Sequence, residues 1–334
     1  MPKVVINGFG RIGRPVLKNI LANHKDLEIV AINDLGGSKP LAHLLKYDSN
    51  YGIYEKDVKS DDDGIIIDGK KIKLFQQKDI MNLPWRDLEI DIVIECTGAY
   101  KNSEDLNKHL ESGAKKVVVS VPIQDAKVPT YLMGINIDKY EPSKDHVISM
   151  ASCTTNGLAP LVRVIHENFK IKNGVFTTVH SYTNDQRILD LPHKDLRRAR
   201  AAALNIIPTT TGAAIAIEKA FPELKSLLNG TAIRVPTSTV SIVDFTAIVV
   251  KNTTADEINS VMKEASQNEL KGILDVCDQP LVSSDFKGNS NSSILDSALT
   301  MANDNLVKVT AWYDNEWAYS MRLAELVNLI ANKL

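Results

Sequence analysis

One cysteine stands where its thiol could act as a nucleophile. Cys153 follows a short strand-like run, His146–Met150, and precedes apolar residues that recur with the spacing of one helix face, namely Leu158, Leu161, Val162, Ile165 and Phe169. A thiol at a helix N-terminus faces unpaired N–H groups and the positive end of the helix dipole, and both favour the thiolate. The alternative is a buried structural cysteine whose Ser and Thr neighbours cap the helix.

A thiol nucleophile needs a base, and His180 is the best candidate. It lies in the strand-like run Gly174–Ser181 and is followed by hydroxyl and amide residues. Together with a nicotinamide cofactor, such a pair predicts aldehyde oxidation. The thiolate adds to the carbonyl, hydride passes to the cofactor, and a second nucleophile cleaves the resulting thioester. A satisfied structural histidine is the alternative. The other histidines are interpreted as surface or packing residues: His24, His43, His109, His146, His166 and His193.

Several side chains have the chemistry that binds phosphate. Ser152 and Thr154 are small donors beside the cysteine. The basic run His193–Arg200 precedes Pro208–Gly212, whose hydroxyls and glycine N–H suit a phosphate monoester. Arg234 stands in an apolar strand, where a guanidinium needs an anionic partner. For the basic run, a salt-bridge face exposed to solvent or lying between subunits is the alternative.

The N-terminal region carries a glycine pattern typical of dinucleotide binding. The run Lys3–Asn7 leads into Gly8-Phe9-Gly10-Arg11-Ile12-Gly13, then a helical face, the apolar run Glu28–Asn33 and Asp34. The three glycines allow a tight turn, close approach to a pyrophosphate and close helix–strand packing. Asp34 follows Gly13 by 21 residues (34 minus 13), near the roughly 20 expected for an acid that binds a ribose hydroxyl. An ordinary turn and a solvated loop acid are the alternatives.

Asp34 also bears on the choice of cofactor. A carboxylate that accepts a ribose 2′-OH would repel a 2′-phosphate, and Leu35–Ser38 contains no arginine to bind one, although Lys39 is close. The sequence therefore predicts NAD rather than NADP. The acids Asp61–Asp63 lack the alternating spacing of a calcium loop, so we interpret them as a loop or hairpin and predict no metal site.

Length and composition favour a two-domain globular protein of the cytoplasm. A chain of 334 residues is long for a single core. A net charge of −2 provides no basic field for nucleic acid or membrane. We find no signal-peptide pattern and no apolar run near the roughly 18 residues of a membrane span. Three widely spaced cysteines fit a reducing compartment and argue against a disulfide framework.

The strand and helix patterns predict two kinds of sheet. Up to Met150, alternating strands and helices indicate an α/β, Rossmann-type, doubly wound parallel sheet. Later runs, Thr239–Lys251 and Val307–Tyr313, alternate in part, which indicates an α+β domain with a largely antiparallel sheet. A helix is predicted over Ala255–Gln267, with Thr254 and Glu257 in capping-box positions.

The most specific motifs lie in five stretches: Ile6–Arg14 (INGFGRIGR), Ala151–Asn156 (ASCTTN), His180–Gln186 (HSYTNDQ), Ile207–Ala214 (IPTTTGAA) and Trp312–Glu316 (WYDNE). Together they resemble the phosphorylating, NAD-dependent glyceraldehyde-3-phosphate dehydrogenases of bacterial type, over essentially the whole chain. The resemblance implies an NAD-binding domain at residues 1–151, completed by a C-terminal helix at 316–334, a catalytic domain at 152–315, and a homotetramer. Tyr182–Ile206 resembles the loop that reaches a neighbouring subunit's cofactor.

The resemblance also implies a role for individual residues. Cys153 is the expected nucleophile and His180 the residue that activates it. Thr183 and Arg234 are expected to bind the C3 phosphate of the substrate. The expected inorganic phosphate site comprises Ser152, Thr154, Arg198, Thr211 and Gly212. The expected NAD contacts are Gly8, Gly10, Arg11, Ile12, Gly13, Asp34, Lys78, Ser120 and Asn315.

The implied reaction is the oxidation of glyceraldehyde 3-phosphate to 1,3-bisphosphoglycerate, a step of glycolysis and gluconeogenesis, with inorganic phosphate cleaving the thioester on Cys153. An alternative is erythrose-4-phosphate dehydrogenase, in which water cleaves the thioester. The sequence separates the two poorly, because one extra hydroxymethylene is a small difference for a pocket to distinguish. A non-catalytic protein that binds dinucleotide or RNA is a further alternative, against which the net charge and the Cys153/His180 pair argue.

Overall fold

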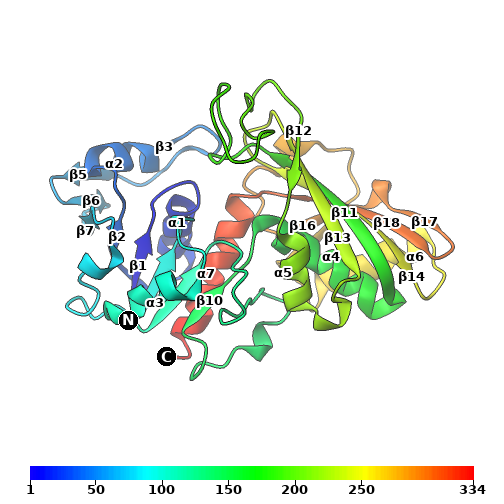
Figure 1. Ribbon diagram of the computed structural model, residues 1–334, viewed down its shortest axis with the longest axis horizontal. Coiled ribbons are helices and arrows are strands. Elements are labelled where there is room, and N and C mark those ends of the chain that lie inside the picture. Colours follow the sequence, from blue (N-terminus) through cyan, green and yellow to red (C-terminus); the bar gives the residue numbers. More distant parts are fainter. The chain divides into compact units, whose positions relative to one another are not determined.

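The computed structural model describes residues 1–334 in two compact units (Figure 1). The first unit comprises Met1–Tyr131, Asp138–Ala151 and Ser320–Leu334, and the second comprises Leu132–Ile137 and Ser152–Tyr319. None of the helices combines the length and the apolarity that a membrane crossing requires.

The first unit is built on an eight-stranded sheet with the order β10-β9-β8-β1-β2-β7-β6-β5. The strands are β1 (Lys3–Asn7), β2 (Glu28–Asn33), β5 (Val58–Asp61), β6 (Gly64–Ile67), β7 (Lys70–Phe75), β8 (Ile92–Glu95), β9 (Lys116–Val119) and β10 (Val147–Ser149). Only β5, β6 and β7 pair antiparallel, whereas the other neighbours are parallel. The predicted doubly wound sheet and the hairpin at Asp61–Gly64 are confirmed.

Helices connect these strands. They are α1 (Gly13–Asn23), α2 (Ser38–Lys46), α3 (Ser103–Glu111) and, at the C-terminus, most of α7 (Trp317–Ala331). A short ribbon, β3 (Tyr47–Asp48) with β4 (Gly52–Ile53), follows α2. Central strand residues such as Val5, Val93 and Val117 are completely buried. Burial on both faces explains why these strands are continuous apolar runs in the sequence.

The turn between β1 and α1 requires its glycines. Gly8 has a φ of +94°, and a Cβ atom there would lie 2.6 Å from the backbone nitrogen of Thr97. A Cβ atom on Gly13 would lie 2.3 Å from the carbonyl oxygen of Gly8. Both positions therefore exclude any side chain, as the close helix–strand packing inferred from the motif requires.

The order of the strands creates a switch point beside β1. The chain continues from β1 to β2 on one side and later returns to place β8 on the other side of β1. In open α/β sheets, ligands bind outside the carboxyl ends of the strands at such a point. The carboxyl ends of β1, β2 and β8 are therefore where a ligand of this unit is expected.

The second unit contains a largely antiparallel sheet with the order β12-β13-β11-β14-β18-β16-β15, in which β17 also pairs with β18. The strands are β11 (Ile171–Ser181), β12 (Ile207–Thr210), β13 (Leu228–Val235), β14 (Ser241–Val249), β15 (Leu274–Cys277), β16 (Ser293–Asp296), β17 (Met301–Asn303) and β18 (Leu306–Tyr313). The pairs β11–β13 and β15–β16 are parallel, and the other pairs are antiparallel. The predicted antiparallel character is confirmed.

Three helices accompany this sheet: α4 (Cys153–Phe169), α5 (Ala213–Ala220) and α6 (Ala255–Gln267). The apolar face of α4 is buried as its spacing predicts, and the helix packs against β14, β16 and β18. At the start of α6, the Thr254 hydroxyl accepts from the Glu257 N–H at 3.2 Å, and the Glu257 carboxylate accepts from the Thr254 N–H at 3.0 Å. The predicted capping box is confirmed.

Candidate active site

Cys153 is the first residue of α4, in a tight connection from β10. Ala151 takes a left-handed conformation with a φ of +57°, which is unfavourable for a residue with a Cβ atom. Ser152 then caps the helix, and its hydroxyl accepts from the Thr155 N–H at 3.1 Å. The strand-to-helix transition predicted from the sequence is confirmed, and the thiol lies beside the N-terminus of the helix.

His180 lies next to this thiol. It occupies the end of β11, is buried, and has its Nε2 3.4 Å from the Cys153 Sγ. Its Nδ1 lies 2.6 Å from the carbonyl oxygen of Ser181. A carbonyl can only accept, which favours the proton on Nδ1, whereas the Arg234 Nη1, which can only donate, also lies 2.9 Å from Nδ1. With the proton on Nδ1, Nε2 presents its lone pair to the thiol. This is the tautomer that a base for the Cys153 thiol requires.

Burial governs the proton affinity of this pair. It raises the pKa of the Cys153 thiol, although the Arg234 charge and the Thr154 N–H act in the opposite direction. Burial and, after it, the charge of Arg234 together lower the pKa of His180 to about 3. The helix N-terminus favours the thiolate as expected, but burial outweighs it. A neutral thiol therefore faces a neutral imidazole, and the proton must move as the sulfur attacks.

Arg234 completes the group through the pairing of β11 with β13. The parallel register places Arg234 directly opposite His180, and its Nη1 lies 2.9 Å from the His180 Nδ1. Nη1 also donates to the Ser181 carbonyl at 3.0 Å and lies 3.4 Å from the Thr183 Oγ1. The Nε of Arg234 is buried without a partner. A guanidinium with an unsatisfied buried N–H and no carboxylate beside it is suited to an anionic ligand.

The other residues predicted to bind phosphate lie on neighbouring segments. Arg198 pairs with Asp185 at 2.5 Å and donates from Nε to Thr209 at 2.9 Å. Arg200, in contrast, forms an exposed pair with Asp190, as the salt-bridge alternative for the basic run predicted. Thr211 and Gly212 immediately precede α5, with the Thr211 hydroxyl accepting from the Ala213 N–H at 3.2 Å. Thr154 follows the nucleophile on α4, and Ser152 caps that helix.

Two further side chains fix the surroundings of the pair. Tyr313 is buried, and its hydroxyl lies 3.0 Å from the Thr154 Oγ1 and 2.7 Å from the Thr178 Oγ1. Its ring stands edge-on to His180 with 6.1 Å between centroids, and burial raises its pKa. Sequence reasoning assigned Tyr313 no role, although it lies in the WYDNE motif. The Asn315 Oδ1 accepts from Ser181 and Ser241, both at 2.9 Å, which orients its amide.

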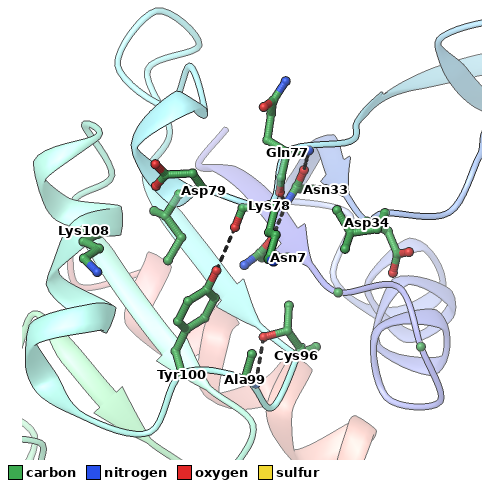
Figure 2. A pocket seen from close by; sticks show the side chains of 15 residues that line it. Asn7, Asn33, Asp34, Gln77, Lys78, Asp79, Cys96, Ala99, Tyr100 and Lys108 are labelled. Atoms are coloured by element: carbon green, nitrogen blue, oxygen red, sulfur yellow. Dashed lines mark hydrogen bonds between the residues drawn. The ribbon is translucent and has the colours of Figure 1, made fainter.

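In the first unit, a cavity of about 740 Å³ opens at the predicted switch point (Figure 2). Four of the residues predicted to contact a cofactor line it: Gly8, Gly10, Asp34 and Lys78. Arg11, Ile12 and Gly13 instead form the entry to α1, where the Arg11 guanidinium pairs with Asp48 at 2.7 Å. Ser120 follows the end of β9, and Asn315 belongs to the second unit.

The cavity has features suited to an adenine dinucleotide. The Asp34 carboxylate accepts from the Phe9 N–H at 2.7 Å and the Gly36 N–H at 2.8 Å, which fixes it beside the glycine turn. A Cβ atom on Gly10 would meet nothing within 4 Å, so space remains where α1 begins. The start of a helix attracts a pyrophosphate, and a carboxylate in a fixed position can accept hydrogen bonds from ribose hydroxyls. The residues present therefore fit the predicted cofactor.

Fold and site together define the class: an oxidoreductase with a Rossmann-type dinucleotide-binding unit and a buried thiol–imidazole pair on a second unit. The family model for the NAD binding domain of glyceraldehyde 3-phosphate dehydrogenase matches residues 2–103, and that for the C-terminal domain of the same enzyme matches residues 152–315. The chain belongs to the glyceraldehyde-3-phosphate dehydrogenase family, and its cofactor is NAD.

Individual relatives agree with the family models. Glyceraldehyde-3-phosphate dehydrogenase from Geobacillus stearothermophilus is 54% identical over 332 residues, covering 99% of this chain and 98% of the relative. Glyceraldehyde-3-phosphate dehydrogenase 2 from Streptomyces avermitilis is 50% identical over 333 residues, covering 99% of both. The chloroplastic form A from Zea mays is 52% identical over 335 residues, covering 99% of this chain and 83% of the relative. The family predicted from the sequence motifs is confirmed.

The contact between Cys153 and His180 predicts how the thiol reacts. Replacing His180→Asn removes the base, so alkylation by iodoacetamide must rely on free thiolate, whose formation burial disfavours. We expect the alkylation rate of Cys153 at pH 7 to fall by at least about tenfold. The rate of the variant should then climb with pH, because the thiolate fraction rises with pH. Mass spectrometry of the time course between pH 6 and 9 measures both effects.

A matched control is His166→Asn, since His166 lies at the other end of α4 and accepts from the Ile171 N–H at 3.2 Å. It should alkylate at the wild-type rate. Equal rates for wild type and His180→Asn at pH 7 would show that the imidazole does not assist the thiol.

Proposed function

We propose that this chain oxidises D-glyceraldehyde 3-phosphate to 1,3-bisphosphoglycerate, with NAD as oxidant and inorganic phosphate as second nucleophile. The observation that carries the proposal is the Cys153 thiol 3.4 Å from the His180 Nε2, with Arg234, whose Nε lacks a partner, on the other nitrogen of the same imidazole. The names of the relatives, all glyceraldehyde-3-phosphate dehydrogenases, give the substrate.

In the first step, the Cys153 sulfur attacks the aldehyde carbon while the His180 Nε2 takes the thiol proton. Oxygen charge develops beside the N-terminus of α4, whose N–H groups and dipole favour it. A bound NAD would supply the acceptor for the hydride that leaves the aldehyde carbon. Cys153 then carries a thioester, and His180 returns its proton to solvent or to the departing product.

Arg234 and Thr183 are suited to hold the C3 phosphate of the substrate. The buried Nε of Arg234 lacks a partner, and the Thr183 hydroxyl lies 3.4 Å from the Nη1. Because the positive charge of Arg234 lowers the pKa of His180, a phosphate placed on the guanidinium offsets that effect. Binding of the correct substrate therefore makes His180 a stronger base at the moment it is needed.

Inorganic phosphate is assigned to the groups around the entries to α4 and α5: Ser152, Thr154, Arg198, Thr211 and Gly212. Hydroxyl groups, a helix N-terminus and a guanidinium are the donors that a phosphate oxygen prefers. The Arg198 guanidinium also forms an ion pair with Asp185. The Asp185 carboxylate therefore offsets part of the positive charge that a phosphate would meet. Phosphate attack on the thioester carbon breaks the C–S bond and releases the acyl phosphate.

We propose that individual residues contact particular parts of the cofactor. Asp34 would accept hydrogen bonds from the hydroxyls of the adenosine ribose. The backbone N–H groups from Gly8 to Gly13 would bind the pyrophosphate, and Lys78 would lie beside the adenine. Ser120 and the oriented amide of Asn315 would contact the nicotinamide half. We assign the NAD-binding domain to residues 1–151 with 316–334 and the catalytic domain to 152–315. Three free cysteines suit the reducing cytoplasm.

The proposal predicts NADH formation that depends on inorganic phosphate. With glyceraldehyde 3-phosphate and NAD, steady turnover should require phosphate and should exceed the rate with erythrose 4-phosphate. Absorbance at the NADH band with and without phosphate measures this. Cys153→Ser should still bind NAD but should lose turnover, because a hydroxyl is a far weaker nucleophile than a thiolate. Turnover indifferent to phosphate, or faster with the tetrose, would mean that water cleaves the thioester.

Two matched variants separate the phosphate sites in the same assay. Thr183→Val should raise the KM for the aldehyde, and Thr211→Val should raise the KM for inorganic phosphate, each by about tenfold for a lost hydrogen bond to a charged group. If Thr183→Val raised the KM for inorganic phosphate and Thr211→Val raised the KM for the aldehyde, the two assignments would be reversed.

We also propose a homotetramer, supported by the loop that follows β11. Six large apolar side chains in residues 188–206 are exposed: Ile188, Leu189, Leu191, Leu196, Leu204 and Ile206. The largest values are 84% for Ile188, 81% for Leu196 and 80% for Leu204. Apolar side chains gathered in this number on one loop mark a protein interface. A second copy of the chain is the partner that the sequence resemblance of this loop indicates.

Light scattering during gel filtration tests the assembly. We expect a mass near four times 36.8 kDa. The double substitution Ile188→Asp/Leu204→Asp should shift the mass toward smaller species, because burying carboxylates in an apolar contact is unfavourable. Val250→Asp, at an exposed position beyond β14, serves as control and should leave the mass unchanged. A wild-type monomer would contradict the proposed assembly.

A further inference from the structure

A carboxylate lies completely buried at the carboxyl end of β8. The side chain of Glu95 has no solvent exposure. One of its oxygens accepts from the N–H and the hydroxyl of Thr97, the N–H at 2.8 Å. The other accepts from the Asn7 amide and lies 3.2 Å from the His109 Nε2. All four contacting groups, which belong to Thr97, Asn7 and His109, can donate, so hydrogen bonds rather than a Lys or Arg side chain surround the carboxyl group.

The orientation of His109 is fixed from its other side. The Nε1 of Trp85 lies 3.0 Å from the His109 Nδ1, and both residues are completely buried. An indole nitrogen can only donate, so Nδ1 must accept and the ring proton lies on Nε2. His109 therefore donates to Glu95. The imidazole thus accepts a hydrogen bond from Trp85 on one side and donates one to Glu95 on the other.

The same network reaches the wall of the cofactor cavity. The Asn7 Oδ1 accepts from the Asn33 amide at 2.7 Å. Asn33 in turn exchanges two hydrogen bonds, both at 2.9 Å, with the backbone of Gln77. Asn7, Asn33, Gln77 and Thr97 all line the cavity, and Figure 2 shows the first three side by side. Glu95 thus connects the ends of β1, β2 and β8 with the segment that follows β7.

His109 supports a second part of that wall through Tyr100. The Tyr100 ring stands edge-on to the imidazole with 6.4 Å between centroids. Its hydroxyl donates to the Lys78 carbonyl at 3.1 Å, across the opening of the cavity (Figure 2). Lys78 and Tyr100 both line the cavity. One buried histidine therefore supports both sides of the space proposed for the adenosine.

Burying a carboxyl group is costly unless its hydrogen bonds are satisfied, so a buried acid is poor evidence of a role in stability. Its position under the cavity wall, rather than in the apolar core, points to a role in binding. We propose that His109 and Glu95 are positioning residues for NAD, which hold the strand ends and Tyr100 in the arrangement that receives the adenosine half. The inference rests on NAD binding at this cavity.

Calorimetric titration with NAD and with ADP-ribose tests the inference without any turnover. His109→Leu removes both hydrogen bonds and should raise the Kd of both ligands by at least about tenfold. His109→Gln should remain within about threefold of wild type, because its Nε2 can donate to Glu95 while its Oε1 accepts from Trp85. Equal losses for NAD and ADP-ribose locate the defect in the part that the two ligands share and exclude the nicotinamide ring. Circular dichroism verifies that each variant is folded.

A second pair of variants serves if His109→Leu fails to fold. Glu95→Gln keeps the volume but turns one acceptor into a donor that faces Asn7 and His109, and it should raise the Kd for ADP-ribose at least about tenfold. Asp91→Asn makes the same chemical change just before the start of β8, where Asp91 pairs with Lys115 at 2.7 Å, and should leave the Kd unchanged. Folded His109→Leu or Glu95→Gln protein with wild-type affinity would overturn the inference. Wild-type protein that binds neither ligand would instead refute the cofactor assignment on which it rests.

Discussion

The chemistry proposed for this chain depends on one contact, 3.4 Å between the Cys153 Sγ and the His180 Nε2. The contact exists because two elements end at the same place: α4 begins at Cys153, and β11 ends just beyond His180. Neither element could shift by one residue without losing it, since a one-residue slip of a strand moves a side chain to the opposite face. The strained Ala151 and the Ser152 cap fix the start of the helix.

The other charges of the site act through that pair. Arg234 faces His180 across β13 and β11, so its positive charge favours the thiolate and disfavours the imidazolium. Burial keeps both reacting groups neutral. Under the proposed function, a substrate phosphate on Arg234 would offset the guanidinium charge and so strengthen His180 as a base. In the first unit, the carboxyl group of Glu95 is also buried and is held by hydrogen bonds at the wall of the cavity.

Local sequence patterns predict the position of Cys153 at a helix start and the position of the cofactor cavity. Helical spacing after Cys153 located the nucleophile at a helix start, and the glycine motif with Asp34 located the cofactor cavity, because both signals lie within a few turns of chain. The contacts of His180, in contrast, could not be predicted from local patterns. Arg234 is 54 residues away and reaches the imidazole only through a parallel strand register. His109 was interpreted as surface or packing, since its tautomer and its role depend on Trp85 and Glu95, to which only the folded chain brings it. Burial, which raises the pKa of Cys153, has no local signature either.

The central claim is that Cys153 carries the acyl group between oxidation and phosphate attack. Rapid quenching of the enzyme with NAD and glyceraldehyde 3-phosphate, in the absence of inorganic phosphate, should trap that group. Mass spectrometry of the digested protein should then find a phosphoglyceroyl thioester on the peptide containing Cys153, and the adduct should disappear when phosphate is added. An adduct on another residue, or NADH formed in a full burst with no adduct on Cys153, would contradict the account.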